Sequence, residues 1–126
     1  MKTKFHYTGI QVRDLDKSIA FYTKLLGMKL VDRQKIPDTD GEVAFLKTEG
    51  SAQLLELNFY NGKKGYKHGD EMDHLAFEVT NLDTALPYFE RHGAKRVYRI
   101  IKSERSRWTY VTDPNGIWIE LIDHRP

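Results

Sequence analysis

Hydrophobic and polar positions follow the same succession of patterns twice along the chain. In the first copy, apolar and polar residues alternate from Phe5 to Arg13, which predicts a strand with Ile10 and Val12 on one face. From Leu15 to Leu26, apolar residues recur at spacings of 4, 3 and 4, which predicts an amphipathic helix that ends at Gly27. Three more strands are predicted near residues 29–35, 42–48 and 52–59.

The second copy begins with an alternating strand from Asp73 to Val79. A helix that carries Leu86 and Phe89 follows. Because proline lacks an N–H, Pro87 fits only within about the first turn, so we expect this helix to start near Asp83. An exposed loop is predicted over residues 61–70, and three closing strands are predicted near residues 96–102, 107–112 and 117–123.

The two copies can be aligned with each other residue by residue. Val12 falls on Val79 at an offset of 67 residues, and Gly27 falls on Gly93 once one residue is dropped. Near the ends of the copies, Glu56 falls on Glu120 at an offset of 64. The sequence therefore predicts an α+β protein, a single domain over residues 1–126 made of two βαβββ modules, residues 5–60 and 72–124.

Composition and charge exclude several kinds of binding partner and of chemistry. The 126 residues carry a net charge of +2 with scattered basic residues, which argues against nucleic acid. The absence of cysteine excludes disulfides, cysteine metal sites and a thiol nucleophile. No apolar run is long enough for a signal peptide or a membrane span, so we expect no membrane partner and a cytoplasmic location.

Alternation along the strands also assigns faces to four polar residues. Tyr7, Glu56, His74 and Glu120 all point away from the predicted helices. A single glutamate or histidine at such a place is usually only solvated. Together, however, one imidazole and two carboxylates suit a divalent cation, which would relieve the repulsion between the carboxylates. The set favours a metal or catalytic site.

Three segments resemble the glyoxalase I branch of the vicinal oxygen chelate (glyoxalase/bleomycin resistance/dioxygenase) superfamily. They are VRDLDKSIAFYTKLLGM at 12–28, DHLAFEV at 73–79 and DPNGIWIELID at 113–123. The resemblance implies paired modules that form a cup of curved mixed sheets, and a homodimer. It also implies a divalent ion held by Glu56, His74 and Glu120. The usual first ligand, His or Gln, is replaced by Tyr7, whose neutral phenol, with a pKa of about 10, is a poor ligand.

The resemblance also implies where a small-molecule substrate would bind. Glutathione-using members carry an arginine at the place of Gln11, so the glutathione carboxylates need another partner here. We expect Gln11, Arg107 and Trp118 to contact the substrate.

The function implied is a metal-dependent lyase or isomerase of glyoxalase I (lactoylglutathione lyase) type. Its substrate would be an α-keto hemithioacetal formed with glutathione or another thiol, and it would react through an ene-diolate. Nickel, cobalt, zinc or manganese would serve as the ion, and Glu120 would move the proton. The alternatives are an epimerase or a dioxygenase on the same scaffold, or a drug-sequestering binding module without metal, which an aromatic Tyr7 would suit.

Overall fold

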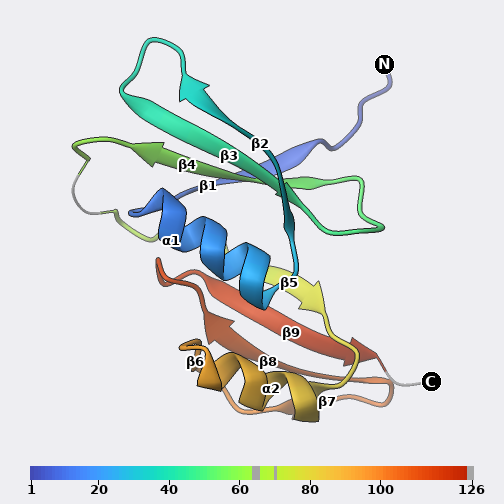
Figure 1. Ribbon diagram of the computed structural model, residues 1–126. Coiled ribbons are helices and arrows are strands. Elements are labelled where there is room, and N and C mark those ends of the chain that lie inside the picture. The colour runs from blue at the N-terminus through green and yellow to red at the C-terminus, as the bar shows by residue number, and fades with distance from the viewer. Residues whose placement is uncertain (64–65, 70, 125–126) are drawn as a thin grey trace. The chain divides into compact units, whose positions relative to one another are not determined.

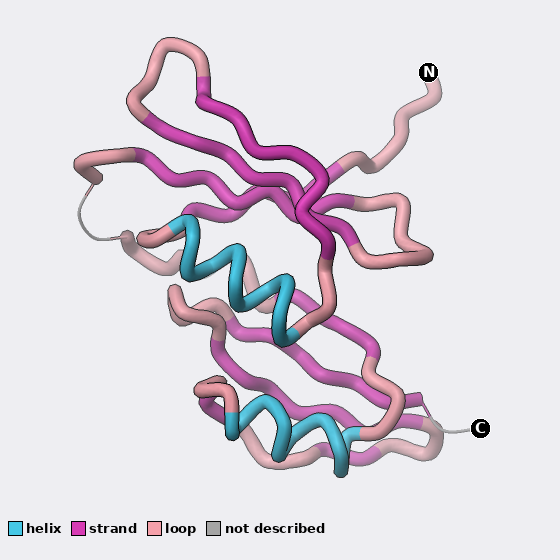
Figure 2. Tube along the Cα trace, in the orientation of Figure 1, coloured by secondary structure: helices cyan, strands magenta, loops and turns pink. Residues whose placement is uncertain are grey.

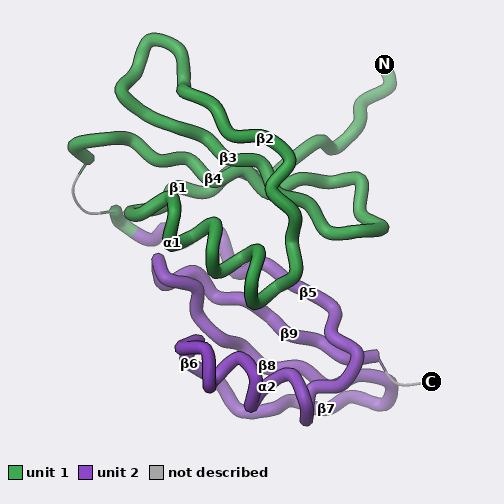
Figure 3. The backbone as a smooth tube through the Cα atoms, in the orientation of Figure 1, with its two compact units in different colours: residues 1–67 green, residues 68–126 purple. Residues whose placement is uncertain are grey.

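The computed structural model describes residues 1–63, 66–69 and 71–124. The chain forms two compact units, residues 1–67 and 68–126 (Figure 3). The boundary falls in the segment between the two predicted modules, and residues 64, 65 and 70 of the loop expected there lie outside the described residues. Each unit combines a mixed β-sheet with one helical segment (Figures 1 and 2), so the predicted α+β class is confirmed. None of the described helices is long and apolar enough to cross a membrane.

Unit 1 holds a four-stranded sheet in the order β1-β4-β3-β2. The first strand is parallel to β4, and the other pairs are antiparallel. The helical segment contacts β3 and β4. The elements are β1 (Tyr7–Gln11), α1 (Leu15–Ala20), the π-helical turn η1 (Phe21–Leu25), β2 (Lys29–Ile36), β3 (Gly41–Lys47) and β4 (Leu54–Tyr60).

The helix of unit 1 begins with a side-chain cap and ends on a glycine. Asp14 Oδ1 accepts a hydrogen bond from the backbone N–H of Lys17 at 3.1 Å, as an N-cap residue does. The predicted continuous α-helix was wrong in its second half, where η1 replaces it. The Thr23 hydroxyl donates to the Ile19 carbonyl at 2.7 Å. Gly27 has a φ of +69°, which favours glycine and confirms the predicted helix end.

Unit 2 repeats this arrangement with one further strand pairing. Its sheet has the order β5-β9-β8-β6, with β7 also paired to β8 and β5 parallel to β9. The strand predicted over residues 96–102 was wrong as one element, because two short strands occupy this stretch. The elements are β5 (Leu75–Glu78), α2 (Leu82–Arg91), β6 (Lys95–Arg96), β7 (Ile101–Lys102), β8 (Ser106–Thr112) and β9 (Trp118–His124).

Helix α2 starts earlier than the sequence predicted. Asn81 Oδ1 accepts a hydrogen bond from the N–H of Asp83 at 2.9 Å, so Asn81 is the N-cap and the first helical residue is Leu82. Pro87 consequently lies in the second turn, where it offers no N–H to the carbonyl of Asp83. The expectation that this proline fits only the first turn was wrong.

Candidate functional site

Glu56 occupies the middle of β4, on the face turned away from the helix. Its neighbours Leu55 and Leu57 are buried, and alternation places Glu56 on the opposite side of the sheet. Gly9 on β1 and Phe45 on β3 flank it in the strand register. A Cβ at Gly9 would lie 2.9 Å from Glu56 Oε1, so the missing side chain leaves room for the carboxylate. Glu56 Oε1 accepts a hydrogen bond from the Asn58 amide at 2.6 Å.

Tyr7 lies on the same face of the unit 1 sheet as Glu56. Its ring stands edge-on to the ring of Phe45, with centroids 5.4 Å apart, and Phe45 pairs directly with Glu56. Tyr7 is 41% exposed to solvent. The face predicted for Tyr7 therefore matches its position in the sheet.

His74 and Glu120 approach each other in unit 2. His74 immediately precedes β5, and Glu120 lies at the centre of β9. The distance from His74 Nε2 to Glu120 Oε1 is 3.6 Å. His74 Nδ1 lies 2.5 Å from Asp73 Oδ2. Because a carboxylate only accepts hydrogen bonds, Nδ1 carries the proton in neutral His74 and the Nε2 lone pair faces Glu120.

This pair fits two ligands of one divalent ion. Nitrogen and oxygen ligands at about 2.0–2.2 Å from an ion lie roughly 3–3.5 Å from each other, close to the 3.6 Å between His74 Nε2 and Glu120 Oε1. Metal-binding histidines commonly donate their other ring N–H to a carboxylate, as His74 does to Asp73. Glu56 belongs to the other unit. No group of three or more His, Cys, Asp or Glu side chains arranged for a metal occurs among the described residues.

Tyr110 adds a hydrogen bond that the sequence analysis missed. It pairs with Glu120 across β8 and β9, and its hydroxyl donates to Glu120 Oε1 at 3.1 Å. Burial is the main cause that raises the pKa of Tyr110 above that of a free phenol, and the hydrogen bond to Glu120 is the second. The raised pKa keeps the hydroxyl protonated, as a donor must be. The ring also stands edge-on to His74, with centroids 5.2 Å apart. Alternation along residues 107–112 was the signal that could have placed Tyr110 on this face.

The three expected substrate-binding residues have different surroundings. Gln11 pairs with Asn58 in register, on the face of Glu56, and its Oε1 accepts a hydrogen bond from Lys63 Nζ at 2.8 Å. Trp118 lies on the face of Glu120, is 40% exposed, and has its ring centroid 5.3 Å from that of Tyr110. Both positions suit contact with a substrate.

Arg107 lies apart from the other two residues expected to contact the substrate. It alternates with Tyr110 along β8 and so lies on the opposite face of the sheet from Glu120. Its guanidinium is buried and bonds Asp123 at 2.6 Å and Asp83 at 3.1 Å. The hydrogen bond that Arg107 donates to Asp123 raises the pKa of Arg107 further, so the guanidinium stays charged and pairs with carboxylates of its own unit.

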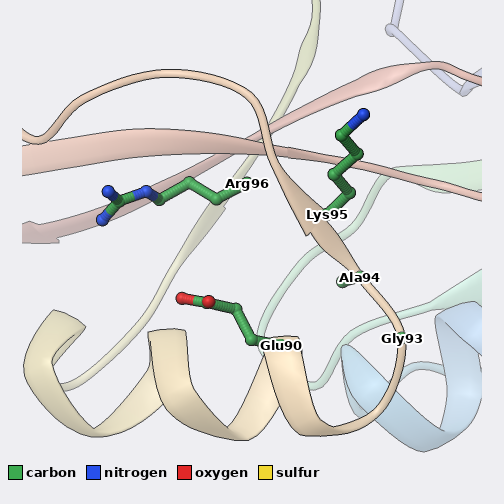
Figure 4. A pocket seen from close by; sticks show the side chains of 5 residues that line it. All are labelled: Glu90, Gly93, Ala94, Lys95 and Arg96. Atoms are coloured by element: carbon green, nitrogen blue, oxygen red, sulfur yellow. The ribbon is translucent and has the colours of Figure 1, made fainter.

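A shallow hollow lies elsewhere on unit 2, where the end of α2 leads into β6 (Figure 4). Figure 4 shows Lys95 and Arg96 pointing in different directions from its wall. The hollow contains none of the predicted site residues, and its lining is Glu90, Gly93, Ala94, Lys95 and Arg96.

Comparison with known proteins settles the family. The sequence profile of the Glyoxalase/Bleomycin resistance protein/Dioxygenase superfamily matches residues 4–121. The chain belongs to this superfamily. It is 33% identical over 121 residues to the lactoylglutathione lyase of Salmonella typhimurium, covering 93% of this chain and 90% of that protein. It is 30% identical to the lactoylglutathione lyase of Schizosaccharomyces pombe, covering 94% of this chain but only 47%, about half, of that relative.

Solved structures give the same picture. A trypanothione-dependent glyoxalase I of Leishmania major superposes with a TM-score of 0.83 at 32% identity, covering 97% of this chain and 87% of that one. Glyoxalase I from Zea mays gives 0.86 at 26% identity, covering 98% of this chain and 45% of that one. The resemblance to glyoxalase I found in the sequence is thus confirmed.

Proposed function

We propose that this chain is a glyoxalase I-type lyase that isomerises an α-keto hemithioacetal, or a related small carbonyl compound, through an ene-diolate. The observation that carries the proposal is the His74–Glu120 pair, 3.6 Å apart on one face of the unit 2 sheet. The lactoylglutathione lyases that match over nine-tenths of the chain support the same reaction class.

In this proposal Glu56, His74 and Glu120 would hold a divalent ion, with Tyr7 as a weak fourth donor at most. Nickel, cobalt, zinc and manganese are all compatible with two carboxylates and one imidazole. When bound, such an ion would stabilise negative charge on neighbouring substrate oxygens. Asp73 holds His74 in the tautomer that leaves Nε2 available. Glu120 takes the proton from one substrate carbon and returns it to the next.

The thiol cosubstrate carries a carboxylate in this proposal, as glutathione does. Gln11 stands where glutathione-using relatives carry an arginine, and Lys63 Nζ lies 2.8 Å from its Oε1. The ammonium group also lies 4.9 Å from the centre of the Tyr66 ring, so two side chains orient it. Lys63 therefore supplies a positive charge beside Gln11, in place of the arginine of the glutathione-using relatives.

A binding module without chemistry is the second candidate, and one observation favours it. Tyr98 and Trp118 are each 40% exposed, and their rings group with that of Tyr110. Such an aromatic surface would stack on a flat ligand without any ion. The Glu120 carboxylate and the His74 imidazole, which contact Tyr110, would then have no role in binding.

Matched variants of the two glutamates test the enzyme proposal. Glu120→Gln should lower the rate of isomerisation at saturating metal by about 10²–10⁴-fold, because the amide cannot accept the proton. Glu56→Gln should instead weaken metal affinity more than it lowers this rate. The assay is isomerisation of α-keto hemithioacetals made with several thiols.

Equal and small losses in the two variants would reject Glu120 as the base. An unmutated, metal-loaded protein that is inactive with every thiol would favour the binding module.

A further inference from the structure

The two glutamates of the proposed site are held by different hydrogen-bond donors. Glu56 Oε1 is bonded by the Asn58 amide from its own strand, at 2.6 Å. Glu120 Oε1 is bonded by the Tyr110 hydroxyl from the neighbouring strand, at 3.1 Å. Phe45 pairs with Glu56 as Tyr110 pairs with Glu120, but it has no hydroxyl. The phenol is therefore a feature of unit 2 alone.

The Tyr110 hydroxyl bonds the Glu120 oxygen that would also bind the metal ion beside His74. Glu120 Oε1 accepts its hydrogen bond and is also the atom 3.6 Å from His74 Nε2. The Tyr110 ring is itself held, edge-on to His74 and 5.3 Å from the ring of Trp118. A flexible carboxylate is thus fixed at one oxygen by a donor that has little freedom.

We infer that Tyr110 is a positioning residue for the metal site. Its hydroxyl fixes Glu120 Oε1 beside His74 Nε2, as Asp73 fixes the His74 ring, so unit 2 presents both ligands in place before an ion arrives. The inference rests on the metal site of the proposed function but not on the reaction. Without the hydroxyl, the Glu120 side chain would lose rotamer freedom only when the ion binds, and that cost would weaken affinity.

Metal affinity measured without substrate tests this role. In chelator competition with Co²⁺ on protein stripped of metal, Tyr110→Phe should raise the dissociation constant about 10–100-fold, as loss of an outer hydrogen bond to a ligand does. Tyr98→Phe is the matched control, because it removes a hydroxyl from the same aromatic group without touching Glu120. It should change the dissociation constant by less than about threefold.

A double-mutant cycle separates positioning from general damage. If Tyr110 acts through Glu120, Tyr110→Phe should have almost no further effect on Co²⁺ affinity in a Glu120→Ala background. Thermal melting of the metal-free variants checks that each is folded. The phenylalanine ring keeps the packing, as Phe45 does in unit 1.

Three results would overturn the inference: Co²⁺ affinity unchanged in Tyr110→Phe, an equal loss in the Glu120→Ala background, or no Co²⁺ binding by the unmutated protein. A tight Co²⁺ complex that is weakened by Tyr110→Phe, in a protein inactive on every hemithioacetal, would uphold the inference while the proposed reaction fails.

Discussion

Tyr7 in unit 1 holds the position that His74 holds in unit 2. Each residue precedes its glutamate's partner on the parallel strand by two positions. Each ring also stands edge-on to the aromatic residue paired with that glutamate. The centroids are 5.4 Å apart for Tyr7 and Phe45, and 5.2 Å apart for His74 and Tyr110. An imidazole at position 7 would therefore point as His74 does.

Tyr7→His should tighten metal binding. Neutral imidazole is a far commoner ligand than a phenol, and an added ligand should lower the Co²⁺ dissociation constant by at least the roughly tenfold that an outer contact contributes. Tyr7→Phe is the control, because it keeps the ring against Phe45 without any donor and should bind like the unmutated protein. Unchanged affinity in Tyr7→His would mean that position 7 does not face the ion.

At the scale of single residues, the sequence predicted the sheet face of a side chain but did not predict its hydrogen-bond partner. Alternation with buried leucines was enough to place Glu56 and Glu120, because side chains in a strand have only two directions. The donor Tyr110 depends on the register between β8 and β9, which alternation does not reveal. A signal for the surroundings of Arg107 did exist, since Arg107 shares its strand face with the buried Val111.

At the scale of elements, a buried charge pair attaches α2 to its sheet. Asp123 on β9 accepts hydrogen bonds from the N–H of Leu82 at 2.8 Å and from Arg107 Nη2 at 2.6 Å. Arg107 Nη1 also bonds Asp83 in the first turn at 3.1 Å. These contacts stabilise the start of a helix that Pro87 weakens. The sequence did not predict the Asp123–Arg107 pair or the start of α2 at Leu82. The pattern along a strand does not show which residue on another element a polar side chain contacts.

Asp123→Ala should destabilise the protein by about 3 kcal/mol, near the lower end of the 3–5 kcal/mol typical of a broken buried pair, because Asp83 still contacts Arg107. Urea unfolding measures the change in free energy. Asp16→Ala is the matched control, since it removes the exposed partner of Arg33 and should cost at most about 1 kcal/mol. Equal losses in both variants would contradict the anchoring role of Asp123.

At the scale of the whole molecule, one exposed edge strand bears on how the chain associates. In its own sheet, β2 is an edge strand that is exposed almost throughout, and Leu30 and Val31 are 44% and 46% exposed. An exposed edge strand presents unpaired N–H and C=O groups with which another chain can pair. Together with the family resemblance, this supports a homodimer.

Sedimentation equilibrium at micromolar concentration should therefore give a mass of about 30 kDa, twice that of the 14.8 kDa chain. A dilution series and a metal-free sample show whether the association depends on concentration or on the ion. A mass near that of one chain under all of these conditions would refute the dimer.

The π-helical turn of unit 1 explains why the two copies differ in length. Tyr22 aligns with Phe89 at an offset of 67 residues, but Gly27 aligns with Gly93 at 66. The hydrogen bond that closes each helical segment also differs by one residue. Met28 N–H donates to the carbonyl of Tyr22, six residues back, whereas Ala94 N–H donates to the carbonyl of Phe89, five residues back.

The one extra residue of unit 1 thus lies inside the helical segment, because a π turn holds one residue more than an α turn. The buried residues before it and the glycine after it keep their places. The difference in length between the two copies is thus accommodated in regular structure instead of in a loop. A correct alignment of the two halves therefore opens its gap within residues 23–26, and one that moves the gap to a loop would pair the wrong side chains across the turn.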